Sequence, residues 1–75
     1  MILYFENRLG ELRSIADCKT EEEVIRNIHE FIDKINRKRP PEKQFKIPYI
    51  RIWKEDECTI YDVGSHVEFF KWENN

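Results

Sequence analysis

The chain has 75 residues, about half the length of a typical domain, so we expect residues 1–75 to form one small domain. Hydrophobic residues make up 40% of it, and two Trp, three Tyr and five Phe give an aromatic content that disordered chains lack. The formal net charge is −2, and no apolar run approaches the roughly 18 residues of a membrane span. Composition therefore argues against a disordered, multidomain or membrane-spanning protein.

The start of the chain predicts a cytoplasmic protein. Its apolar run, residues 1–5, stops at Glu6 and is too short for the roughly 7–15-residue core of a signal peptide. We therefore expect Cys18 and Cys58 to be reduced thiols, with a single bridge between them as the alternative. Residue types with AT-rich codons outnumber those with GC-rich codons by 31 to 12, which suggests a low-GC bacterium or a phage as the source.

The clearest predicted element is a helix that begins after Thr20. Thr20 and Glu23 have the spacing of a capping box, in which each side chain bonds the backbone N–H of the other residue. Apolar residues then recur at helical spacing from Val24 to Ile35. The basic run 37–39 and the prolines at 40–41 predict the end of this helix.

A second helix is predicted before it, over much of residues 3–16. Ile2, Phe5, Leu9, Leu12 and Ala16 follow 3-4-3-4 spacing, although Gly10 weakens a helix there. The alternative is a short strand over residues 1–5 followed by a shorter helix. The brief connection at 17–19 predicts that the two helices form an antiparallel hairpin.

After residue 45 the hydrophobic period changes to two, which predicts three strands in an antiparallel meander. The charged run 54–57 connects the first two strands, and Gly64-Ser65 fits a two-residue type II′ turn before the third. The expected fold class is therefore α+β: a two-helix antiparallel hairpin packed on a three-stranded meander (ααβββ), with a short extra N-terminal strand as a variant.

The predicted strand register pairs Lys54 with Cys58 and Val63 with His66, and it gives the meander two apolar faces. We expect the helical hairpin to cover the aliphatic face, which carries Ile50, Ile52, Cys58, Ile60, Val67 and Phe69. The opposite face then stays open and carries Tyr49, Arg51, Trp53, Tyr61, Val63, Phe70 and Trp72. An open aromatic surface usually marks a binding site. In the alternative arrangement each helix covers one face.

Charge is segregated along the chain. Residues 21–36 carry −3, residues 37–54 carry +6 and residues 55–75 carry −5. The simpler interpretation is that the basic segment neutralises acidic neighbours. The alternative is a patch for an anion or nucleic acid. That patch would consist of Arg37, Lys38, Arg39, Lys43, Lys46 and Arg51.

Catalytic and metal sites are not expected. Cys18, His29, Cys58 and His66 lack the close ligand pairs of structural zinc sites. Asp62, Ser65 and His66 contain the side-chain types of a hydrolytic triad, but they are clustered at a turn, where Ser and Asp commonly bond backbone amides. The sequence therefore predicts no enzyme activity, no metal and no cofactor.

The expected order of elements, a helical hairpin followed by an antiparallel meander, resembles that of RelE/ParE-type toxins. Those ribosome-dependent toxins are typically basic, whereas this chain is acidic overall and lacks their dense C-terminal basic residues. The resemblance implies nucleic-acid binding as a second hypothesis. Tyr49, Arg51, Trp53 and Trp72 would then stack on bases or a nucleotide.

The preferred hypothesis is a small non-enzymatic interaction protein of phage or mobile-element origin, an accessory or inhibitor that binds a protein partner. Trp, Tyr and Arg are the residue types enriched at binding hot spots. The expected anchors are Tyr49, Arg51, Trp53, Tyr61, Phe70 and Trp72. Because so small a domain has little core, we also predict a two-fold homodimer through the same face, which sedimentation equilibrium would detect.

Overall fold

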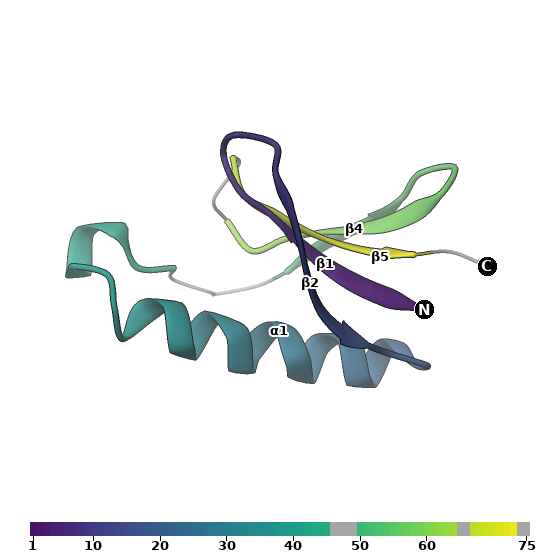
Figure 1. Cartoon of the computed structure of the whole chain (residues 1–75), viewed down its shortest axis with the longest axis horizontal. Helices are drawn as coiled ribbons and strands as arrows, with labels where there is room; N and C mark the ends of the chain where they lie inside the picture. Colours follow the sequence, from purple (N-terminus) through teal and green to yellow (C-terminus); the bar gives the residue numbers. More distant parts are fainter. Residues whose placement is uncertain (46–49, 65–66, 74–75) are drawn as a thin grey trace.

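The computed structural model describes residues 1–45, 50–64 and 67–73. In this part of the chain, five antiparallel strands form one sheet and a long helix lies along one side of it (Figure 1). The elements are β1 (Ile2–Glu6), β2 (Leu12–Asp17), α1 (Glu21–Asn36), the short 3-10 helix η1 (Pro41–Lys43), β3 (Arg51–Lys54), β4 (Cys58–Asp62) and β5 (Phe69–Glu73). The strands lie in the order β2-β1-β5-β4-β3, so β5 is central.

The α+β class is correct, but the predicted two-helix hairpin on a three-stranded meander is wrong, because residues 2–17 form a β-hairpin. Leu3 and Phe5 are buried on alternate positions of β1, which is the two-residue period of a strand. Asn7 ends the strand: its Oδ1 accepts from the Leu9 and Glu11 amides at 2.9 and 3.0 Å. Gly10 then takes a φ of +82°, which favours glycine. Local turn chemistry thus overrides the 3-4-3-4 spacing.

The predicted helix after Thr20 is confirmed. The Thr20 hydroxyl accepts from the Glu23 amide at 3.2 Å, and three glutamates occupy the first turn of α1. Val24, Ile28 and Ile32 form its buried stripe. Asn36, the last residue of α1, exchanges two hydrogen bonds with the backbone of buried Phe45, and these hold the following segment against the core.

The C-terminal strands β3, β4 and β5 form the predicted meander, but with a different register. Glu55 donates from its amide to the Cys58 carbonyl at 2.8 Å, so the β3–β4 turn closes around two residues instead of three. Lys54 consequently pairs with Thr59, where the prediction had Cys58. Between β4 and β5, Tyr61 pairs with Phe70, two residues from the predicted register. Of the predicted Gly64-Ser65 turn, Gly64 is described and has a φ of +95°, whereas Ser65 lies outside the described residues, as does His66.

A one-residue change of register moves every side chain of β3 to the opposite face relative to β4. The face of the sheet against α1, here called the inner face, therefore carries Tyr61, Phe70 and Trp72 together with Ile52. The core consists of Leu3, Phe5, Cys18, Val24, Ile28, Ile32, Phe45, Tyr61, Val63 and Phe70. The helix thus covers the face that carries Tyr61, Phe70 and Trp72, and burial of these rings removes a large apolar area from water.

Candidate functional site

The predicted partner face is divided between the two sides of the sheet. Tyr61 and Phe70 are 0% exposed, so they are core residues with no surface to offer a partner. Trp72 is half-buried on the inner face, where its Nε1 donates to the carbonyls of Met1 and Cys18, both at 3.3 Å. Only Arg51 and Trp53 lie on the opposite, outer face. Tyr49 is outside the described residues.

The outer face of the sheet carries a cluster of its own, which we call the outer-face cluster: Trp53, Ile60 and Phe69. Trp53 pairs with Ile60 across β3 and β4, and the rings of Trp53 and Phe69 meet edge-on with centroids 6.3 Å apart. Ile60 is buried even though it lies outside the core beneath α1, whereas Trp53 is 37% exposed. The sheet therefore presents a small apolar centre on the side away from the helix.

Arg51 is fixed beside this cluster by a buried carboxylate. Its guanidinium donates to Asp62 Oδ2 at 2.7 Å and lies 5.7 Å from the centre of the Trp53 ring. Asp62 is 0% exposed and also accepts from the Gly64 amide at 2.9 Å. The Arg51 side chain nevertheless remains 53% exposed. Arg51 is thus oriented before any partner arrives, which lowers the entropy lost on binding.

A shallow cavity of about 220 Å3 lies next to the outer-face cluster. It is lined by Glu6, Trp53, Glu55, Ile60, Phe69 and Lys71. Two interactions order its rim: Lys71 bonds Glu6 at 3.1 Å, and the Trp53 indole N–H donates to Glu55 at 3.2 Å. Apolar walls within a ring of fixed polar groups suit one protruding side chain of a partner better than a free small molecule.

Sequence reasoning missed Phe69, which it assigned to the face covered by helices. Phe69 and Phe70 are adjacent in one strand, so their side chains must point to opposite faces of the sheet. In the sequence, these two adjacent phenylalanines and Trp53 indicate that each face of the sheet carries apolar side chains. Which face stays open depends on the position of the single long helix that the structure describes.

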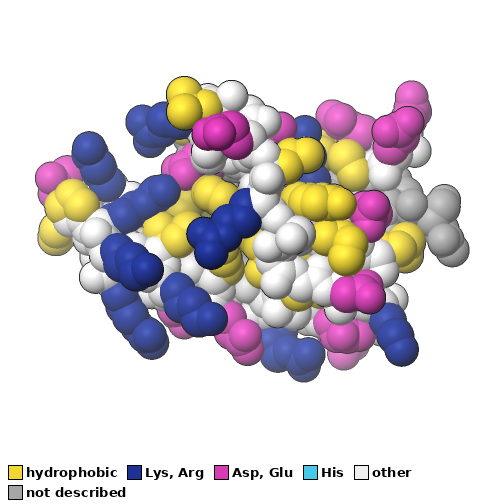
Figure 2. Space-filling model, in the orientation of Figure 1, with side chains coloured by type: hydrophobic (Ala, Val, Ile, Leu, Met, Phe, Trp, Pro, Cys, Tyr) yellow, Lys and Arg dark blue, Asp and Glu magenta, His cyan; other side chains and the backbone are white. Residues whose placement is uncertain are grey.

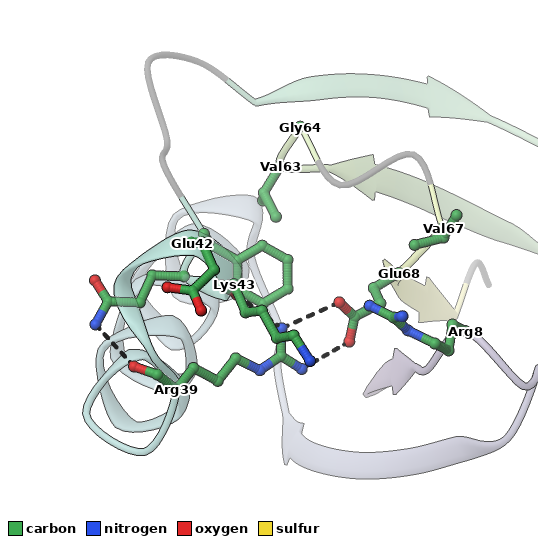
Figure 3. Close-up of a pocket in the computed structure, with 10 residues that line it drawn as sticks. Arg8, Arg39, Glu42, Lys43, Val63, Gly64, Val67 and Glu68 are labelled. Atoms are coloured by element: carbon green, nitrogen blue, oxygen red, sulfur yellow. Dashed lines mark hydrogen bonds and ion pairs between the residues drawn. The ribbon is translucent and has the colours of Figure 1, made fainter.

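Two arginines of the predicted anion patch, Arg39 and Arg51, are paired with buried carboxylates. Figure 3 shows Arg39 extending to Glu68, to which it makes two hydrogen bonds of 3.2 and 2.9 Å. Glu68 is buried, and the Arg39 guanidinium also stacks over Phe45 at 5.1 Å. Arg51 likewise donates to a buried carboxylate, that of Asp62. Arg37, Lys38 and Lys43 are exposed, and Lys46 lies outside the described residues.

Charge is segregated in space as well as along the chain. The β1–β2 turn lies toward the end of the molecule where α1 stops, and the β3–β4 turn lies toward the end where α1 begins (Figure 1). In this view most of the cations therefore lie toward one end and most of the carboxylates toward the other (Figure 2). The basic end consists of Arg8, Lys34, Arg37, Lys38 and Lys43, and the acidic end of Glu21, Glu22, Glu23, Glu55, Asp56 and Glu57.

The residues discussed above for metal binding and catalysis do not come together in the described part of the chain. In this part of the chain, no group of three or more His, Cys, Asp or Glu side chains is placed to hold a metal ion. Burial raises the pKa of both the Cys18 and the Cys58 thiol, which disfavours the nucleophilic thiolate. Both cysteines are free. Of the triad-like residues, Asp62 is engaged by Arg51, while Ser65 and His66 lie outside the described residues.

Comparison of the chain with protein-family models, with curated proteins and with solved structures finds no match in any of the three. The helical hairpin on which the resemblance to RelE/ParE-type toxins rested is not the arrangement found, since β1 and β2 occupy that part of the chain. Among the helices that the structure describes, none is long and apolar enough to cross a membrane.

Proposed function

We propose that this chain is a non-enzymatic interaction protein that binds a protein partner through the outer face of its sheet. The observation that carries the proposal is the outer-face cluster with its adjoining arginine. Trp53 is partly exposed above the buried Ile60, and Arg51 is held against Trp53 by Asp62. Trp and Arg anchors that surround a dry apolar centre are typical of binding hot spots.

The mechanism would be steric occupation of a surface on the partner. An apolar side chain of the partner would enter the cavity between Trp53 and Phe69, while a carboxylate or carbonyl would accept from Arg51. The Glu6–Lys71 pair would form part of the polar rim. A phage or mobile-element accessory protein that inhibits a host protein would act in this way without any chemistry of its own.

The test is affinity capture from a lysate of a low-GC bacterium, followed by mass spectrometry, with three matched forms of the chain. The wild type and a Leu9→Ala variant should capture the same protein, because Leu9 is exposed in the β1–β2 turn and does not line the cavity. Trp53→Ala should reduce its capture by at least about tenfold, the loss expected when a hot-spot tryptophan is truncated. Equal capture by all three forms would contradict the proposal.

Nucleic-acid binding is a second proposal, supported by the exposed cations of the basic end. Two observations weaken it: Trp72, one of the expected stacking residues, is half-buried with its indole N–H bonded to two backbone carbonyls, and Arg39 is paired with Glu68. Reversing Arg39 would therefore perturb the fold itself. Reversal of Arg37 and Lys38 is the cleaner test, since both are exposed, and it should remove any binding of an oligonucleotide measured by anisotropy.

A further inference from the structure

A second groove lies on the other side of the molecule, between the edge strand β2 and the C-terminal half of α1. Its volume is about 330 Å3, and its lining combines apolar residues with cations. It is lined by Arg13, Ser14, Ile15, Phe31, Lys34, Ile35 and Lys38. At this end of the molecule, Figure 2 shows yellow apolar side chains among dark-blue cations. This groove shares no residue with the outer-face cluster.

The strand beside the groove has a free side. β2 is the outermost strand of the sheet and pairs with β1 on one side, while no described strand pairs with its other side. Such an edge presents backbone N–H and C=O groups to an extended peptide. The register of β1 and β2 shifts between Leu3 and Tyr4, where Ile15 is the extra residue of a bulge. The bulge would limit an added strand to the part of β2 before it, residues 12–14.

The lining of the groove indicates what would bind there. Arg13, Lys34 and Lys38 are cationic, and none of the described lining residues is acidic. Half-buried Ile15 and Ile35 form apolar surface, and the Arg13 guanidinium lies 5.8 Å from the centre of the Phe31 ring. Charge complementarity calls for an anionic ligand, while the apolar surface calls for aliphatic side chains, which nucleic acids lack.

We propose that this groove binds an extended acidic peptide segment of a protein, which adds to the edge of β2 as a further strand. Alternate side chains of a strand point to the same face, so one set would contact the groove. Its apolar members would pack on Ile15, Phe31 and Ile35. Its carboxylates would pair with Lys34 and Lys38, which are four residues apart and lie on the same side of the helix end. This site is independent of the proposed partner face, because the two lie on different elements.

The first experiment measures fluorescence anisotropy with a short labelled peptide in which Glu and Val alternate. The wild type should bind it saturably, and Lys34→Glu/Lys38→Glu should weaken binding by about tenfold or more. Lys19→Glu/Arg26→Glu is the matched control, because it makes the same charge change at exposed positions near the start of α1. The control variant should bind as the wild type does. Equal weakening in both variants, or no binding by the wild type, would overturn the proposal.

A second measurement uses the unmodified protein, so it does not depend on the folding of any variant. Amide hydrogen exchange of residues 12–14 should slow when the Glu–Val peptide is added, because new backbone bonds form at this edge. A Lys–Val peptide should leave the exchange rates unchanged. Tighter binding of a labelled oligothymidylate than of the Glu–Val peptide would instead assign the groove to nucleic acid. Unchanged exchange in β2 on binding would refute strand addition.

Discussion

Phe69 and Phe70 are neighbours in one strand, yet they belong to different parts of the molecule. Phe70 is 0% exposed and packs against Phe5 and Phe31, with ring centroids 5.2 and 5.7 Å away. Phe69 is half-buried on the outer face, where its one ring contact in the described residues is the edge-on contact with Trp53. The position of α1 makes one phenylalanine part of the core and leaves the other as surface. Residue type alone therefore does not separate stability from binding in this sheet.

Truncation of each phenylalanine tests this difference most directly. Phe70→Ala should lower the free energy of unfolding by about 3–5 kcal/mol, because it leaves a cavity in the core. That loss is comparable with the whole stability of a domain of this size. Phe69→Ala should cost less than about 1.5 kcal/mol, since that ring is partly exposed. Urea unfolding followed by circular dichroism measures both changes, and equal losses would contradict the assignment of the two faces.

The covered face is also held at its edge by an ion pair, which gives the second prediction. Arg39→Ala removes two hydrogen bonds from the buried Glu68 carboxylate and should cost about 2–3 kcal/mol. Lys38→Ala, at the exposed neighbouring position, should change stability by less than about 0.5 kcal/mol. The midpoints of thermal unfolding of the two variants, measured under the same conditions, test this difference. Similar midpoints for both would show that the Arg39–Glu68 pair does not stabilise the fold.

The third prediction concerns the buried hydroxyl group of Tyr61 on the covered face. The Tyr61 hydroxyl is buried without a hydrogen-bond partner among the described residues, and desolvation raises the pKa of Tyr61 from 10.0 to about 12. Tyr61→Phe removes this unsatisfied group, so at neutral pH it should leave stability unchanged or raise it by about 1 kcal/mol. Urea unfolding at pH 7 measures this change. A clear loss of stability would show that the hydroxyl has a partner.

The wild type and Tyr61→Phe should also differ in how their free energy of unfolding changes at high pH. The phenol ionises at lower pH in the unfolded chain than in the folded one, so the wild type loses stability as the pH rises from 10 toward 12. The loss amounts to about 2–3 kcal/mol for a shift of this size. Tyr61→Phe should lack this part of the loss, whereas any contribution from Cys18 is common to both proteins. Parallel stability curves above pH 10 would contradict the pKa shift.

The covered side of the molecule could be predicted in part from the sequence. The limits of α1 followed from its cap, its apolar stripe and the prolines beyond it, because these signals are local and all agree. Residues 1–17 carried conflicting signals. Apolar residues at 2, 5, 9, 12 and 16 fit a helix, while Asn7 and Gly10 fit a turn between strands. The tertiary structure followed the turn residues, and Leu9 became exposed.

The outer face could not be predicted, because it depends on loop length and helix position. A single residue in the β3–β4 turn decides whether Trp53 pairs with Ile60, as in the structure, or with Thr59, as in the predicted register. Trp53 and Arg51 were correctly selected as surface residues, but their neighbours were not. The groove beside β2 could not be predicted from the sequence either, because it forms only if residues 12–17 are a strand and α1 passes along that strand.

The central place of β5 has a consequence for synthesis of the chain. β5 joins two hairpins that both precede it in the sequence, β1–β2 on one side and β3–β4 on the other. Its pairing with β1 brings together residues such as Leu3 and Trp72 from opposite ends of the chain. The sheet therefore closes only after residue 73 has left the ribosome. Until then, the edges of β1 and β4 that pair with β5 stay unpaired, and unpaired strand edges favour association.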